Sequence, residues 1–429
     1  MRLSGWCWGV IIAVVISGCS THRYFSAPIH QAEKDFKDHI GFVVYDPAKE
    51  KTLYTHQGDR YFTPASNTKI FTYYTSLVVL GDSIPALRYE LRNDSLIFWG
   101  TGDPSFLYEN TYRDHRAYDF LKNHPSRLFF SSSNFDTEYF GPGWAWDDHN
   151  DYYQVERTPF PIYGNIGTVK KSGTMFNSFP DVFNYAIADS SQNQQGKMSR
   201  ALDSNAMTYT PGKTDRPRQW NVPFHCSDPL LVKLLGDTLK REVIAISRKL
   251  PANAKVLYSV KADSLYKVMM QTSDNFIAEQ LLMICSGVMR DTLSSEIGIQ
   301  YMKKKFLADL PDEPIWIDGS GLSRYNLFTP RSIVSLWEKI YKLVPADRLP
   351  LLLAVGGESG TIKNHYKADK PFIIGKTGSL SNHHTLSGFL VTKRGRTLIF
   401  SWMNNNFTVP SSEIRMRMEI VLKRIYEKY

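Results

Sequence analysis

Apolar and polar positions alternate in two short segments near the start of the chain, and this alternation predicts a strand pair. The segments are residues 41–45 and 52–55, with a turn-forming stretch between them. A buried helix is predicted next. Pro64 and Ser66 are typical of a helix start, and the run 69–80 is apolar enough to be buried.

The pattern changes over residues 85–224, where short β-forming runs alternate with turns. Residues 95–99 and 127–130 are two such runs, and the stretch 189–221 is polar and interrupted by glycine and proline. This alternation of short β-forming runs and turns predicts a β-rich domain inserted into the rest of the chain.

Helical periodicity returns after the insert. Leucines recur at helical spacing over 230–239, and a second helix is predicted from residue 263. The triplet Ser273-Asp274-Asn275 interrupts that helix, and a third helix follows through Ile277. The remaining predicted elements are strands at 372–374, 386–391 and 397–400 and an amphipathic C-terminal helix capped by Ser412.

Composition narrows the class of protein. The chain has 429 residues, of which 42% are hydrophobic, so it can bury more than one core and two domains are expected. The net charge of +9 favours contact with anionic surfaces such as a cell wall or membrane. No basic run or nucleic-acid motif is present, so nucleic acid is not expected as a partner.

The N-terminus has the pattern of a processing signal. Arg2 precedes an apolar run, 6–16, that is too short for a normal membrane span. Small residues lead directly into Cys19, and this ending resembles the bacterial lipoprotein signal. The resemblance implies a signal peptide at 1–18 and a lipid-anchored tether at 19–34. We therefore expect a membrane-anchored lipoprotein of the extracytoplasmic bacterial envelope, facing the periplasm. An ordinary secretory signal is the alternative.

Two cysteines remain in the body of the mature chain. Cys226 and Cys285 can form one disulfide in an oxidising compartment or stay as two buried thiols. The sequence leaves both alternatives open.

Three short strings contain the parts of one acyl-transfer site: Ser66-Asn67-Thr68-Lys69, Ser273-Asp274-Asn275 and Lys376-Thr377-Gly378. Similar motifs occur elsewhere in the chain, including Ser264-Leu265-Tyr266-Lys267 and Lys171-Ser172-Gly173. Context separates the copies, because Ser66 starts a buried helix whereas Ser264 is expected to be a helix N-cap. Lys376 follows a predicted strand, and no strand is predicted before Lys171.

The residue types suggest separate catalytic roles. Ser66 is the expected nucleophile, and Lys69 is the nearest base if burial and the cation of Lys376 lower its pKa. Ser273 can relay a proton to the leaving amine, and Asn275 can hold the substrate amide. Lys376 and Thr377 suit a terminal carboxylate by charge and by hydroxyl.

Further strings give a family resemblance to the low-molecular-mass class C penicillin-binding proteins, which are D-Ala-D-Ala carboxypeptidases and endopeptidases. The match runs from about residue 40 to 405. It rests on the three strings together with Gly100-Thr101-Gly102-Asp103-Pro104, Gly143-Trp144-Ala145-Trp146-Asp147-Asp148, Ser273-Asp274-Asn275-Phe276-Ile277-Ala278-Glu279, Asp318-Gly319-Ser320-Gly321-Leu322-Ser323-Arg324-Tyr325-Asn326 and Lys376-Thr377-Gly378-Ser379-Leu380.

The resemblance implies an α+β fold with a penicillin-recognising, β-lactamase-like core, an antiparallel sheet with a helical lobe. The core is expected at 35–84 and 225–429, with the β-rich insert at 85–224, as one subdomain or two. The resemblance also implies substrate-binding roles for Thr377, Gly378, Ser379 and Asp148. The backbone N–H groups of Ser66 and Ser379 would form the oxyanion hole. Asp148 would approach the side-chain amine of the peptide's diamino acid, although a turn aspartate after two core tryptophans is an equal alternative.

The resulting hypothesis is a serine D-Ala-D-Ala carboxypeptidase, with endopeptidase activity as a further possibility. It would act on peptidoglycan stem peptides and be acylated by β-lactams. No cofactor is expected, and no metal-ligand cluster stands out. The adjacent His383 and His384 are interpreted as loop or surface residues. The alternatives are a serine β-lactamase and a catalytically silent wall-binding lipoprotein.

Overall fold

The computed structural model describes residues 26–111, 114–214, 216 and 218–429. The predicted signal peptide and Cys19 lie outside the described residues. The chain divides into two compact units, and each has its own core. Unit 1 comprises the chain up to Asn67, Asp309–Ile315 and Asn326–Tyr429, and unit 2 comprises Thr68–Ala308 and Trp316–Tyr325.

Unit 1 is built on a six-stranded antiparallel sheet. The strand order is β14-β15-β16-β17-β1-β2, so an early strand, β1, pairs with the last strand of the chain, β17, inside the sheet. The predicted strand pair and the three predicted C-terminal strands are all present. The strands are β1 (His39–Asp46), β2 (Lys51–His56), β14 (Ala354–Val355), β15 (Ile373–Leu380), β16 (His383–Val391) and β17 (Thr397–Asn405).

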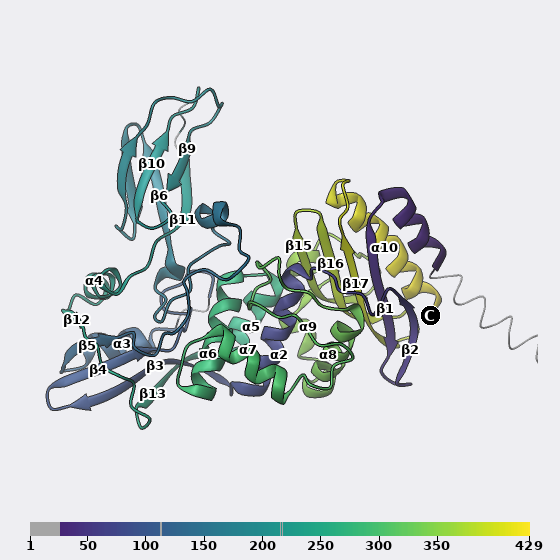
Figure 1. The fold of residues 1–429 in the computed structure, drawn as a ribbon, viewed down its shortest axis with the longest axis horizontal. Helices are drawn as coiled ribbons and strands as arrows, with labels where there is room; N and C mark the ends of the chain where they lie inside the picture. The colour runs from purple at the N-terminus through teal and green to yellow at the C-terminus, as the bar shows by residue number, and fades with distance from the viewer. Residues whose placement is uncertain (1–25, 112–113, 215, 217) are drawn as a thin grey trace, which may run out of the picture. The chain divides into compact units, whose positions relative to one another are not determined.

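Helices cover both faces of this sheet. On one face, α10 (Ser411–Lys428) and the helical residues 26–36 share a hydrophobic core with β1, β16 and β17 (Figure 1). On the other face, Trp337 of α8 (Pro330–Leu343) packs on Phe389 of β16. The short α9 (Leu349–Leu352) and η4 (Gly360–Ile362) complete the unit.

The tether predicted for 19–34 is wrong from residue 26 onward. Residues 26–36 form a helix, and Ile29 and Ala32 on its inner face are fully buried in the unit 1 core. The sequence signal was weak because few apolar residues are needed to bury one side of a three-turn helix.

A helical lobe forms part of unit 2. The predicted helices are present, and α6, almost wholly buried in its first three turns, packs against α2, α5 and α7. The helices are α2 (Lys69–Val79), α5 (Ala262–Gln271), α6 (Asn275–Arg290) and α7 (Ser295–Lys305). Ser264 lies inside α5, whose N-cap is Lys261, so the predicted N-cap role of Ser264 is wrong.

The predicted β-rich insert contributes strands to three sheets. A five-stranded sheet has the order β12-β5-β4-β3-β13, and two three-stranded sheets have the orders β11-β6-β7 and β8-β10-β9 (Figure 1). The five-stranded sheet consists of β3 (Ser83–Arg92), β4 (Ser95–Gly100), β5 (Arg127–Ser131), β12 (Val243–Ala245) and β13 (Lys255–Lys261), with α3 (Arg116–Asn123) and α4 (Asp228–Leu239) in the same core. The smaller sheets consist of β6 (Ile166–Ser172), β7 (Met175–Phe179), β8 (Asn184–Ile187), β9 (Lys197–Arg200), β10 (Ala206–Thr210) and β11 (Arg218–Pro223).

The five-stranded sheet extends past the predicted insert boundary at residue 224. β12 pairs with β5 and β13 pairs with β3, so strands on both sides of α4 belong to one sheet. Lys171 also differs from its prediction, because it lies near the end of a strand, β6, and residues of that strand precede it. What separates Lys171-Ser172-Gly173 from Lys376-Thr377-Gly378 is therefore the sheet to which each belongs.

The two cysteines are free thiols. Cys226 lies before α4 and Cys285 lies within α6, and both are buried. Burial raises the pKa of both thiols, which keeps them protonated and unreactive.

Candidate active site

The first string folds as a tight turn that continues into a helix. Ser66 lies in η1 (Ala65–Thr68), which leads directly into α2, so Ser66 and Lys69 are one helical turn apart. Ser66 is half-buried, and Lys69 has no exposed surface. The boundary between the units falls within this turn. Ser66 and the Lys376 string belong to unit 1, and Lys69 and the Ser273 string belong to unit 2.

In unit 1, Asn67 fastens the serine turn to the sheet. Its side-chain amide donates to the backbone oxygen of Lys376 at 3.0 Å, and its Oδ1 accepts from Ser387 Oγ at 2.6 Å. Ser387 in turn accepts from Trp337 Nε1 at 2.8 Å. This buried chain of hydrogen bonds connects α8, β16, the serine turn and β15. The role of Asn67 is not predictable from the sequence, since nothing in its spacing distinguishes it from a solvated polar residue.

Gly378 allows β15 to approach the serine turn closely. A Cβ atom at this position would lie 2.7 Å from Pro64 O and 2.8 Å from Ser66 N, both of them backbone atoms. A side chain would therefore displace either β15 or the turn. Thr385 Oγ1 donates to the same Pro64 oxygen at 3.0 Å, which adds a second link between the sheet and the turn.

The strand that carries the third string has an open edge. β14 pairs with β15 only through Ile374 and Gly375. Among the described strands, β16 alone pairs with β15 from Lys376 to Leu380. Backbone groups on such an edge can pair with an added extended peptide.

The side chains of the third string alternate along β15. Lys376 is fully buried and its Nζ donates to the backbone oxygen of Thr377 at 2.7 Å. Thr377 Oγ1 lies 2.7 Å from Thr361 Oγ1, and Ser379 is exposed, with Oγ 2.8 Å from His384 Nδ1.

His384 is buried in β16, so its interpretation as a loop or surface residue is wrong. Burial lowers the pKa of His384 to about 3, with a smaller contribution from the positive charge of Arg415. The imidazole is therefore neutral at physiological pH and acts as a hydrogen-bonding partner of Ser379.

In unit 2, Lys69 is held by two acceptors. Its Nζ donates to Asn275 Oδ1 at 2.6 Å and to the backbone oxygen of Ser320 at 2.7 Å. Burial lowers the pKa of Lys69 from 10.5 to about 8, and the nearby carboxylates of Asp318, Glu279 and Asp274 act in the opposite direction. Burial therefore lowers this pKa as expected, the neighbouring charges that shift it are carboxylates rather than the cation of Lys376, and the role of Lys69 as the base stays a prediction.

The second string begins α6 in a conformation that positions its side chains. Ser273 has a positive φ of 63°, an uncommon backbone geometry for a residue with a side chain. Asp274 caps the helix by accepting from Ile277 N at 2.9 Å, and its second oxygen accepts from Tyr108 OH at 2.9 Å. The Asn275 side chain donates to Tyr153 O at 2.9 Å, so both ends of its amide are engaged.

A buried network supports the loop on which Lys69 rests. Glu279 accepts from Ser320 N at 2.7 Å and lies 3.7 Å from Arg157 Nη1. Asp318 accepts from Gly321 N, Ser323 N and Trp144 Nε1 at 2.8, 2.6 and 2.9 Å. Asp318 therefore has a structural role in this loop. The support from Glu279 and Arg157 was missed, because the two residues are far apart in the chain.

Asp148 lies in η2 (Trp146–Asn150). The hydroxyl of Tyr153 interacts with the carboxylates of Asp151 and Asp148, and Tyr153 O is bonded to Asn275. The alternative for Asp148, a turn aspartate after two core tryptophans, is wrong about Trp146, which is 75% exposed. Asp148 thus lies next to an exposed side chain, Trp146, and Tyr153 connects it to Asn275: the Tyr153 hydroxyl interacts with Asp148 and the Tyr153 backbone oxygen accepts from Asn275.

The model of the D-Ala-D-Ala carboxypeptidase 3 (S13) family matches residues 27–425. The chain belongs to this family. It is a serine-type D-Ala-D-Ala carboxypeptidase, and the predicted class C resemblance is confirmed.

Individual relatives agree with the assignment of this S13 carboxypeptidase. The D-alanyl-D-alanine carboxypeptidase DacB of Haemophilus influenzae is 24% identical, with 88% of each chain covered. The crystal structure of penicillin binding protein 4 (dacB) from Haemophilus influenzae superimposes with a TM-score of 0.76 at 20% identity and covers 93% of this chain and 99% of that one. A structure of that protein complexed with a novel β-lactam gives a TM-score of 0.72 at 18% identity, with the same coverage. These likenesses confirm the predicted fold class.

Proposed function

We propose that this carboxypeptidase cleaves the terminal D-Ala-D-Ala bond of peptidoglycan stem peptides through an acyl-enzyme on Ser66. The observation that carries the assignment is Lys69, a fully buried amine with a lowered pKa, one helical turn after a serine at a helix start. A serine hydroxyl is a weak nucleophile at its own pKa and needs such a base.

In the proposed reaction, Ser66 Oγ attacks the carbonyl carbon of the penultimate D-alanine while Lys69 takes the serine proton. The C–N bond breaks, and Ser273 passes a proton to the leaving amine. Water then attacks the ester and restores Ser66. The N–H groups of Ser66 and Ser379 are assigned to the oxyanion hole, where one donor is typically worth ~10²–10³ in rate.

Substrate binding is assigned to the open edge of β15 and to the start of α6. Beside residues Lys376 to Leu380, β15 pairs with β16 and with no other described strand, and such an edge suits an extended peptide, with Asn275 holding its amide. Lys376 and Thr377 are assigned to the terminal carboxylate. Gly378 serves indirectly, because any side chain there would collide with the serine turn.

Asp148 is assigned to the side-chain amine of the diamino acid in the stem peptide. The exposed Trp146 and Tyr152 beside it offer aromatic surface to a peptide. Asp148→Asn is expected to lower turnover of muropeptide and to leave β-lactam acylation unchanged. Equal loss on both substrates contradicts the assignment.

β-Lactams are the expected covalent inhibitors, because their strained amide presents a carbonyl to the same serine. The test is to incubate purified protein and its Ser66→Ala variant with a fluorescent penicillin, a pentapeptide muropeptide and a cross-linked dimer. Stable labelling and D-alanine release that both require Ser66 support the proposal, and cleavage of the dimer adds endopeptidase activity. Rapid β-lactam turnover indicates a β-lactamase instead, and absence of labelling indicates a silent wall-binding protein.

An extracytoplasmic site of action fits a peptidoglycan enzyme, and we propose that Cys19 carries a lipid anchor there. In the described part of the chain, no helix is long and apolar enough to cross a membrane. Two or more acyl chains on Cys19 would suffice to hold the protein. Cys19→Ala should release the protein to the soluble fraction, and retention in the membrane fraction refutes the anchor.

A further inference from the structure

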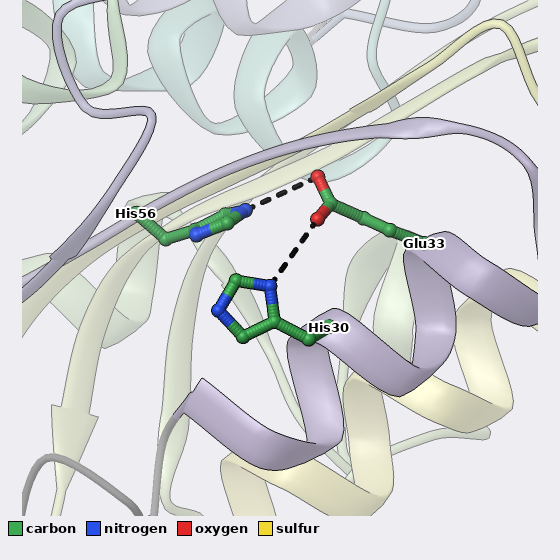
Figure 2. Close-up of side chains that lie close together, drawn as sticks. All are labelled: His30, Glu33 and His56. Carbon is green, nitrogen blue, oxygen red and sulfur yellow. Dashed lines mark ion pairs between the residues drawn. The ribbon is translucent and has the colours of Figure 1, made fainter.

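Two histidines and a glutamate converge in unit 1, outside the residues assigned to catalysis. Figure 2 shows the carboxylate of Glu33 between the imidazoles of His30 and His56. His30 Nδ1 lies 3.7 Å from Glu33 Oε2, and His56 Nε2 lies 3.1 Å from Glu33 Oε1. Within the described ranges, this is the one group of three such side chains whose candidate ligand atoms all lie within 4.8 Å of one another.

The fold presents these side chains from two fixed elements. His30 and Glu33 are three residues apart in the helical stretch 26–36, so they share one face of it. Ile29 and Ala32 of the same stretch are buried in the core and hold that face in place. His56 is the last residue of β2, the edge strand of the sheet, and pairs with Phe42 of β1.

The spacing suits a tetrahedral metal ion. Two ligand atoms that are each about 2.0–2.1 Å from a tetrahedral zinc ion lie about 3.3 Å apart. His56 Nε2 lies 3.1 Å from Glu33 Oε1, His30 Nδ1 lies 3.7 Å from the other oxygen of that carboxylate, and all the candidate ligand atoms lie within 4.8 Å of one another. Two imidazoles and one carboxylate are a known ligand set for zinc-class ions, whereas calcium and magnesium prefer oxygen ligands alone. Three protein ligands leave a fourth position for water.

The carboxylate is already oriented by a second layer of donors. Glu33 Oε1 accepts from Gln57 Nε2 at 2.8 Å and from Ile40 N at 3.2 Å. Hydrogen bonds of this kind fix metal-ligating carboxylates in other proteins. The Glu33 and His56 side chains are only 19% and 13% exposed, whereas His30 is 63% exposed and leaves an entry for the ion.

We propose that His30, Glu33 and His56 bind one divalent transition-metal ion of the zinc class. The ion would join the helical stretch 26–36 to β2 and thereby stabilise the part of unit 1 that lies closest in sequence to the predicted lipid anchor. Its role would be structural, because the proposed acyl transfer uses none of the three residues. No short spacing in the sequence pointed to this site, since His56 comes from a different element.

The test measures binding of Zn²⁺ to full-length protein without an affinity tag, stripped with a chelator, by titration calorimetry. We expect one saturable site per chain and a higher unfolding temperature with Zn²⁺ than without it. Glu33→Gln keeps the size of the side chain and an amide oxygen that can accept from Gln57. This variant should bind at least about tenfold more weakly and lose the thermal shift. His30→Ala should weaken binding in the same way while acylation by a fluorescent penicillin stays unchanged.

The matched control is His365→Ala. His365 is a second partly exposed histidine of unit 1 that contacts a carboxylate, Glu419, at 3.6 Å. This variant should bind Zn²⁺ like the wild type. Equal affinity in wild type and Glu33→Gln, loss of binding in His365→Ala, or no saturable site would each overturn the proposal and leave the three side chains as an ion-pair cluster.

Discussion

The pKa of Lys69 makes a quantitative prediction for the pH dependence of acylation. A lysine acts as a base only when neutral, and with a pKa of about 8 roughly one molecule in ten carries neutral Lys69 at pH 7. The rate constant for acylation should therefore rise about tenfold toward pH 9 and level off above it. If Lys69 had the ordinary pKa of 10.5, the rate constant for acylation would still be rising at pH 9.

The size of this effect follows from burial. The change from 10.5 to about 8 corresponds to about 3 kcal/mol of preference for the neutral amine, which the interior imposes because Lys69 has no exposed surface. The same pKa shift also determines how the stability of the fold changes with pH: stability rises as the pH increases through this range. The folded-state pKa lies below the unfolded one, so the cost of burying Lys69 is present at pH 7 and disappears as the pH rises from about 8 to 10.5.

Glu279 provides the internal check. Its carboxylate raises the pKa of Lys69, so Glu279→Gln should move the rise in acylation rate to lower pH while Gln still accepts from Ser320 N. Burial also raises the pKa of Glu279, so this effect is largest at the alkaline end. Glu90→Gln, which removes a carboxylate paired with Arg248 elsewhere in unit 2, is the matched control and should leave the profile unchanged.

The assay is the second-order rate constant for labelling by a fluorescent penicillin, measured across the range from about pH 6 to pH 10 with circular dichroism as a check on folding. This rate constant reports the ionisation of the free enzyme. A midpoint near the ordinary lysine value, a flat profile, or a shift of Glu279→Gln to higher pH would refute the reasoning about Lys69.

Three further substitutions test the supports of the site. Asn67→Ala should cost about 2–3 kcal/mol in chemical denaturation and lower acylation, because Ser387 and a strand carbonyl lose their buried partner; an unchanged denaturation midpoint contradicts this. Gly378→Ala should abolish labelling of Ser66, since its Cβ would lie 2.8 Å from the Ser66 amide nitrogen. Labelling of this variant at the wild-type rate contradicts the prediction and would mean that β15 can shift to make room for the side chain. Ser273→Gly should raise stability by about 1 kcal/mol through relief of the positive φ and still lower turnover ~10²–10⁴-fold, so unchanged turnover excludes a proton relay.

Local pattern was enough for most of the core elements. The helix after Ser66, the break at Ser273 and the strand that carries Lys376 were all predictable, because helix starts, helix breaks and buried strands leave signals within a few residues. The helical stretch 26–36 was not, since two buried residues, Ile29 and Ala32, supply its contact with the core.

The sequence by itself determined the order of the three strings, the long insert between the first two and the family that this order indicates. Only the tertiary structure decided which residues surround and support the three strings. The bonds of Asn67 to β15 and β16, the support of Ser320 by Glu279, the free thiols and the meeting of His56 with the N-terminal helix all join residues that are distant in sequence. Such contacts depend on sheet register and core packing, which no local spacing encodes. The lowered pKa of Lys69 belongs to the same class, because burial, its main cause, is a property of the folded chain.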